Sequence, residues 1–111
     1  MVARIWHGYT HPSKADLYES LLRNEIFHGI EQRKINGFKG IQLLRRPLAD
    51  EVEFITIMWF EDIDAVKQFA GEDHEKAVVP PEAQQLLNHY DQRSQHYEVL
   101  ENLSYQQLNL I

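Results

Sequence analysis

The sequence contains no cysteine, so the chain can form no disulfide framework and offers no thiolate nucleophile. It also lacks a long apolar run: no stretch approaches the length of a membrane span, and the N-terminus has no charged-then-apolar targeting signal. These absences predict a soluble cytoplasmic protein. No repeat, low-complexity segment or Gly/Ser linker divides the 111 residues, so we expect one domain.

Positive charge is scarce, because 11 Lys and Arg residues stand against 17 Asp and Glu residues, for a net charge of -6. A nucleic-acid partner would need a basic patch, and Arg45 and Arg46 are the only adjacent arginines. The five glycines are scattered and form no phosphate-binding loop, and no serine lies in a nucleophile motif. We therefore expect neither nucleic-acid binding, nor an enzyme with a phosphate-binding loop, nor an enzyme with a serine nucleophile.

The most informative stretch runs from residue 54 to residue 78. Its first part, residues 54–60, is nearly all β-branched, aromatic or apolar, which predicts a strand buried on both faces. Asp62 is a good N-cap, and Gly71 suits the end of a short helix. The apolar residues between them recur at helical spacing: Ile63, Val66, Phe69 and Ala70.

The rest of the chain predicts an α+β fold. We expect strands over residues 2–9, 38–46, 52–60 and 95–100, a long helix over 14–34 and a small extra helix over 82–89. With the short helix before Gly71, the order is β-α-β-β-α-β, which is the ferredoxin-like split βαβ pattern. It predicts one four-stranded antiparallel sheet with helices on one face.

The two middle strands, at residues 40–44 and 52–60, are apolar on both faces. A single sheet with helices on one side would leave an apolar patch larger than the few hundred Å² that soluble monomers usually expose. We therefore expect a twofold homodimer in which the bare sheet faces pack together. The tail, residues 102–111, is also apolar and is expected to dock, because it carries Leu103, Tyr105, Leu108, Leu110 and Ile111.

Histidines offer the clearest chemistry, but their spacing does not predict a metal site. His7 and His11 share a strand parity, yet four residues of strand separate them by about 13 Å. His96 and Glu98 share a face of the last strand and could meet His7, or all three could be ordinary sheet residues. Trp59, at a strand end, and His74, after the next helix, could border one pocket; the alternative is a core Trp and a solvated His.

Three segments of the sequence carry a family resemblance. The first is Trp6-His7-Gly8-Tyr9-Thr10, the second combines residues 54–60 with residues 65–71, and the third is His96-Tyr97-Glu98-Val99. Over residues 1–101 the chain resembles the antibiotic biosynthesis monooxygenase family of dimeric α+β barrels. The resemblance implies the ferredoxin-like fold and the homodimer, and it leaves the tail outside the family domain.

The resemblance also implies a function, because the family includes oxygenases that work without an organic cofactor on polycyclic phenols and anthrones. The leading expectation is a cofactor-free monooxygenase acting on an aromatic or polycyclic compound. A non-catalytic dimeric module that binds a small apolar ligand is one alternative. A haem-degrading monooxygenase is another, although the first strand lacks the Asn and the second helix lacks the Trp of those relatives.

Such chemistry needs a base that takes a proton and an apolar pocket that shields the resulting anion from water. His7, His74 and His96 are the candidate bases, since histidine titrates near neutral pH. We expect His74 to be the base and Trp59, which the resemblance places at the border of the family's cavity, to be a wall. The remaining ligand contacts are expected at Trp6, His7, Tyr9, Phe69 and His96; no metal or organic cofactor is expected.

Overall fold

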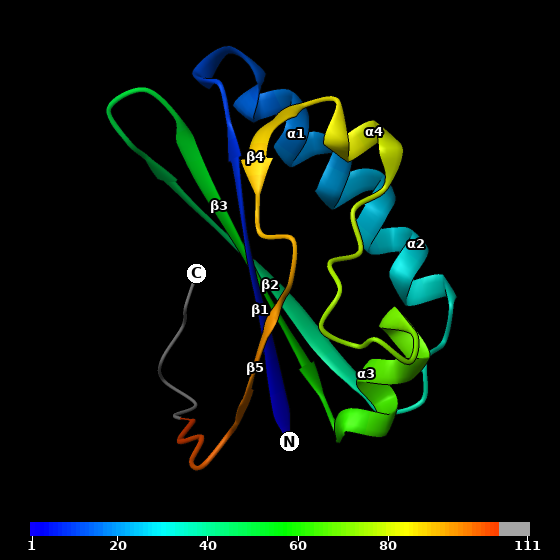
Figure 1. Cartoon of the computed structure of the whole chain (residues 1–111). Coiled ribbons are helices and arrows are strands. Elements are labelled where there is room, and N and C mark those ends of the chain that lie inside the picture. Colours follow the sequence, from blue (N-terminus) through cyan, green and yellow to red (C-terminus); the bar gives the residue numbers. More distant parts are fainter. Residues whose placement is uncertain (105–111) are drawn as a thin grey trace.

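The computed structural model describes residues 1–104. Its antiparallel sheet has five strands, in the order β2-β3-β1, with β4 and β5 sharing the next position along β1 (Figure 1). The strands are β1 (Val2–Thr10), β2 (Phe38–Pro47), β3 (Val52–Phe60), β4 (Leu87–Tyr90) and β5 (Gln95–Glu98). The predicted α+β, ferredoxin-like fold is confirmed, but the sheet has a fifth strand, β4, where a helix was expected.

The helices all lie on one side of the sheet (Figure 1). A long helical rod is built from η1 (Pro12–Lys14), α1 (Ala15–Leu21), η2 (Leu22–Ile26) and α2 (Phe27–Gln32). The short helix α3 (Ile63–Ala70) begins where the Asp62 side chain accepts a hydrogen bond from the Ala65 N–H at 2.9 Å. It ends at Gly71, whose φ of 96° lies in the region that favours glycine.

The prediction of a helix over residues 82–89 is wrong beyond the first turn. Helix α4 covers only Pro81–Gln84, and the chain then pairs with β1 as strand β4. The edge of β1 would otherwise leave backbone groups unpaired, and this pairing satisfies them. The last strand likewise ends at Glu98 rather than at residue 100.

Side chains alternate between the two sheet faces along β1 and along β3, so each residue belongs to one face. Arg4, Trp6 and Thr10 of β1 are buried against the helices, and we call this side the helix face. Two of their cross-strand partners on β3 are also buried there: Met58 pairs with Arg4, and Val52 pairs with Thr10. The core therefore lies between the sheet and the helical rod.

The opposite side of the sheet, the open face, has no helix against it within residues 1–104. It carries Ile5, Ile55, Ile57 and Trp59 at its centre, all half-buried, with Leu44 at 44% exposure toward one edge. The prediction of two-faced apolar strands is thus confirmed. No helix in this part of the chain is long and apolar enough to cross a membrane.

The expected docking of the C-terminal tail falls mostly on residues 105–111, which lie outside the described residues. Within the described part, Leu100 and Leu103 are 90% and 68% exposed. The division of the chain into residues 1–101 and a tail stays a prediction.

Candidate functional site

A cavity of about 60 Å³ lies between the sheet and the helical rod. Its walls come from nearly every element of the fold: Arg4, Trp6, Tyr18, Leu22, Ile26, Phe27, Ile30, Ile41, Thr56, Met58, Phe69, Val78, Val79, Pro80, Ala83 and Ser94. This volume is less than half of the roughly 150 Å³ of an engineered apolar cavity that binds benzene, so by itself it holds only a few waters. The fold therefore contains a small, mostly apolar chamber, and an aromatic ring would need space beyond it.

The cavity continues toward the surface through a wider groove of about 400 Å³. Ile26, Ile30, Phe69, Val78 and Pro80 line both spaces. A larger ring system could occupy the cavity and the groove together.

The helical rod changes its hydrogen-bond pattern where it lines the cavity. The N–H of Phe27 bonds to the carbonyl of Leu22, five residues earlier, so η2 is a π-helical segment. Two of its residues, Leu22 and Ile26, are cavity walls. Single π-turns inside α-helices are rare and frequently accompany functional sites.

Arg4 is the one arginine among the cavity walls, and it is only 3% exposed. Its Nη1 donates to the His74 carbonyl and lies 3.0 Å from His96 Nε2, while its Nη2 donates to the Lys76 carbonyl at 2.9 Å. The guanidinium carbon also lies 5.4 Å from the centre of the Phe69 ring. Burial lowers the Arg4 pKa to about 10, so the group stays charged at neutral pH.

His96 reaches Arg4 from β5, because the register pairs these two residues across the sheet edge. Burial, and then the positive charge of Arg4, lowers the pKa of His96 to about 4. The imidazole is therefore neutral at neutral pH, and its Nε2 can accept a hydrogen bond from Arg4 Nη1. Its Nδ1 is buried and has no hydrogen-bond partner among the described residues.

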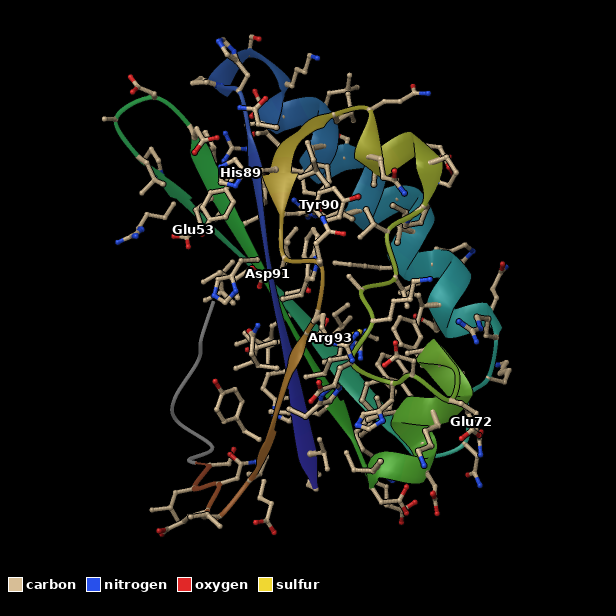
Figure 2. All side chains as sticks on the ribbon, viewed as in Figure 1. Glu53, Glu72, His89, Tyr90, Asp91 and Arg93 are labelled. Carbon is tan, nitrogen blue, oxygen red and sulfur yellow. The ribbon has the colours of Figure 1, made fainter. Side chains whose placement is uncertain are left out.

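The segment joining β4 to β5, residues 91–94, leaves β1 and closes the cavity wall. The indole N–H of Trp6 donates to the Asp91 carbonyl at 2.9 Å, and the Ser94 N–H donates to the Glu75 carbonyl at 2.6 Å. Figure 2 shows Asp91 and Arg93 in this segment, between the two strands. The split edge strand thus holds Trp6 in the cavity and fixes residues 74–76 beside Arg4.

His74, Glu75 and His96 form the one group within residues 1–104 whose ligand atoms could meet at a metal ion, since those atoms lie within 4.8 Å of one another. The hydrogen bond between Arg4 and His96 argues against such a metal site. A metal on His96 Nε2 would have to displace the guanidinium, and a metal on Nδ1 would leave a protonated Nε2 facing another N–H donor. The geometry favours an arginine-bound His96.

Trp59 and His74 do not border one cavity, so that expectation is wrong. Trp59 pairs with Ala3, and both lie on the open face, whereas His74 lies on the helix face with its ring 5.2 Å from that of His96. The sheet separates them. Neither residue is among the cavity walls, so the roles expected for them stay predictions.

Of the other residues expected to contact a ligand, Trp6 and Phe69 are cavity walls, and His96 lies behind Arg4. His7 and Tyr9 point to the open face instead. His7 Nδ1 lies 2.7 Å from Asp91 Oδ2, and the Tyr9 ring stacks on His89 at 4.3 Å. The idea that His7 and His96 could meet is also wrong, because they occupy opposite faces of the sheet.

Sequence reasoning missed Arg4, Tyr18 and Ser94. Arg4 shares a strand parity with Trp6 and Gly8, so its position was available in the alternation of the first strand. Both faces of that strand carry an aromatic residue, however, and the buried face could not be chosen. Ser94 lies in a loop, where no periodicity applies.

Gly8 is needed because the Trp6 ring lies over it. A Cβ on Gly8 would come within 2.5 Å of the indole, whereas a Cβ on Gly29 in α2 would meet nothing within 4 Å. We expect Gly8→Ala to displace the indole, lower the unfolding free energy by about 1–3 kcal/mol and change Trp fluorescence. Gly29→Ala should instead stabilise by about 0.5–1 kcal/mol. Equal effects in thermal unfolding would contradict the tight packing of Trp6.

No protein-family model and no curated protein matches the chain. Solved structures do match. A candidate antibiotic biosynthesis monooxygenase from Bacillus cereus has 14% identity and a TM-score of 0.64, with 94% of this chain and 97% of that chain covered. SnoaB, a cofactor-independent oxygenase from Streptomyces nogalater, crystallised as a point mutant, has 16% identity and a TM-score of 0.61, with 94% and 97% covered.

A third similar structure is the haem-degrader MhuD from Mycobacterium tuberculosis with two haems bound. It has 21% identity and a TM-score of 0.59, with 94% of this chain and 100% of that chain covered. At these identities the likeness concerns the fold. The fold implied by the sequence resemblance is confirmed.

Proposed function

We propose that this chain, which has the fold of the antibiotic biosynthesis monooxygenases, is a small oxygenase that acts on an aromatic compound without an organic cofactor. The observation that carries the proposal is the cavity on the helix face, where apolar walls surround the charged Arg4. The similar fold of SnoaB, a cofactor-independent oxygenase, supports the same reaction class.

The proposed chemistry has two requirements. A proton must leave the substrate, so that an electron-rich anion forms, and that anion must then react with oxygen away from water. For an anthrone, the methylene carbon becomes a carbonyl: one oxygen atom enters the product, the other leaves as water, and the substrate supplies the electrons. The apolar walls would exclude water, and Arg4 would stabilise the anion.

His74 is the base that the arrangement supports best. Its ring lies 5.2 Å from that of His96 and its carbonyl accepts a hydrogen bond from Arg4, a cavity wall, whereas His7 lies on the open face. His96 is less suited to take a proton, because burial and Arg4 lower its pKa to about 4. Trp59 is no longer proposed as a wall of this cavity, because it lies across the sheet.

Filling the cavity tests the proposal. Ala83 is a cavity wall, 2% exposed, and Ala49 is an exposed hairpin residue. Ala83→Leu should abolish conversion of anthrone to anthraquinone at a cost of about 1–3 kcal/mol in stability, and Ala49→Leu should leave both unchanged. Anthraquinone formation that is equal in the two variants and in the original protein would place the reaction elsewhere.

Two other functions remain as competing outcomes of that assay. A non-catalytic module would bind an aromatic compound in the cavity without consuming oxygen. A haem-degrading enzyme would shift the Soret band of added haem, and the likeness to MhuD is the reason to include that titration. The first strand lacks the Asn and the second helix lacks the Trp of haem-degrading relatives, so the oxygenase is the function that we propose.

We also propose that two copies pack through their open faces as a twofold homodimer. Ile5, Ile55 and Ile57 are adjacent across the β1–β3 pair, and Trp59 extends the same apolar surface. Paired polar groups border it: His7 with Asp91, and Arg46 with Glu53. An apolar centre with satisfied polar groups around it is typical of an interface between subunits.

A further inference from the structure

The charge of Arg4 has no negative partner among the described residues. Every Asp or Glu that forms an ion pair within residues 1–104 does so with another residue, and the acceptors around Arg4 are two backbone carbonyls and the neutral His96. Burying an unpaired charge is costly, and buried cations are therefore usually paired. A guanidinium with 3% exposure on the wall of a cavity is an exception that calls for a partner.

The guanidinium also has donors to spare. It carries five N–H groups, and the described contacts use two on Nη1 and one on Nη2. The Nε–H and the second Nη2–H have no acceptor among the described residues. Two oxygens of a carboxylate, or one phenolate oxygen, would match these donors, since guanidinium groups bind such anions with charge-assisted hydrogen bonds.

The contacts that Arg4 already makes hold it in place for this purpose. The carbonyls of His74 and Lys76 and the ring of His96 fix one side of the guanidinium, and the Phe69 ring lies 5.4 Å from its carbon. A donor held in advance gains more from an anion, because less rotamer freedom is lost on binding. The remaining walls, such as Leu22, Ile26 and Met58, are apolar.

We propose that Arg4 is the receptor for a negatively charged group of the ligand, so that the cavity takes an aromatic ring bearing a carboxylate or an ionised hydroxyl rather than a neutral aromatic compound. This proposal rests on the proposed function only in taking the cavity as the ligand site. It names the substrate class: an aromatic acid, or a phenol that ionises beside Arg4.

Benzoate and benzamide form a matched pair of probes, because they have nearly the same shape and differ in charge. At neutral pH we expect the protein to bind benzoate on the order of 10–100-fold more tightly than benzamide, the range of a charge-assisted pair. Calorimetry measures both affinities, and the NMR signal of the Trp6 indole N–H, at the cavity wall, reports whether the probe binds there. Equal affinities, no binding of benzoate at millimolar concentration, or binding that leaves this signal unmoved would overturn the proposal.

Variants of Arg4 distinguish a role in ligand binding from a structural role, in which Arg4 only holds residues 74–76 in place. Arg4→Lys keeps the charge and should retain part of the benzoate preference, while Arg4→Gln should reduce the benzoate-to-benzamide ratio to about one. Arg23→Gln removes an exposed arginine that pairs with Glu19, and it should leave the ratio unchanged. If Arg4→Gln does not fold, the ratio and the Trp6 signal in the unaltered protein still decide the matter.

The outcome is distinguishable from failure of the proposed function. Selective benzoate binding without any oxygen-dependent turnover would support this inference and contradict the oxygenase. Turnover of anthrone with no preference for benzoate would support the oxygenase and contradict the role of Arg4.

Discussion

An Ile57→Glu variant is expected to be a monomer of about 13.1 kDa, whereas the unaltered protein should have about twice that mass in light scattering at micromolar concentration. Ile57 lies at the centre of the open face, opposite Ile5. A carboxylate there would be buried without a cation in the proposed interface, and the twofold axis would bury two of them, at a cost of several kcal/mol each.

Leu17 provides the matched control, because it is an apolar residue on the helical rod with 61% exposure. Leu17→Glu should leave the dimer intact. A folded, monomeric original protein would contradict the twofold dimer, and the apolar open face would then need another cover.

A His74→Ala variant is expected to lose on the order of 10²–10⁴-fold in turnover with little change in stability. This is the usual contribution of one positioned general base. His74 contributes its carbonyl, not its side chain, to Arg4, so the alanine variant keeps the contact that holds the guanidinium. Oxygen uptake with anthrone measures the rate, and thermal unfolding measures the stability.

His28 is the control for His74, because it is an exposed histidine of α2, hydrogen-bonded only to Gln32 among the described residues. His28→Ala should turn over substrate normally. Unchanged turnover in His74→Ala would remove His74 from the mechanism, and a loss confined to His7→Ala would move the reaction to the open face.

Most of the fold could be predicted because strong local signals agree with the tertiary packing. Residues 54–60 of β3 are nearly all β-branched, aromatic or apolar, Asp62 caps the following helix, and Gly71 ends it, as the structure has them. Strand β4 could not be predicted: its sequence, Leu87-Asn88-His89-Tyr90, has little strand propensity and follows a proline-opened helical turn. The unpaired edge of β1 decides its structure, and that edge is a tertiary feature.

The site was harder to predict, because neighbouring residues of a strand point to opposite faces. Met58 and Phe60 face the helices, and Trp59 between them faces away. In an apolar strand without a polar face, the sequence does not show whether the odd-numbered or the even-numbered residues face the helices. The sequence therefore could not place Trp59. Trp6 and Phe69 were predicted as ligand contacts and do line the cavity, whereas the buried charge of Arg4 emerges only from the folded chain.

The central claim is that the cavity on the helix face oxidises an aromatic substrate with molecular oxygen. Mass spectrometry of the product formed from anthrone under ¹⁸O₂, in the presence of a metal chelator, tests it most directly. We expect one ¹⁸O atom in each anthraquinone, with product formed in proportion to the protein and lost in Ala83→Leu. Label that appears equally with heat-denatured protein, or product oxygen that comes from water, would contradict it.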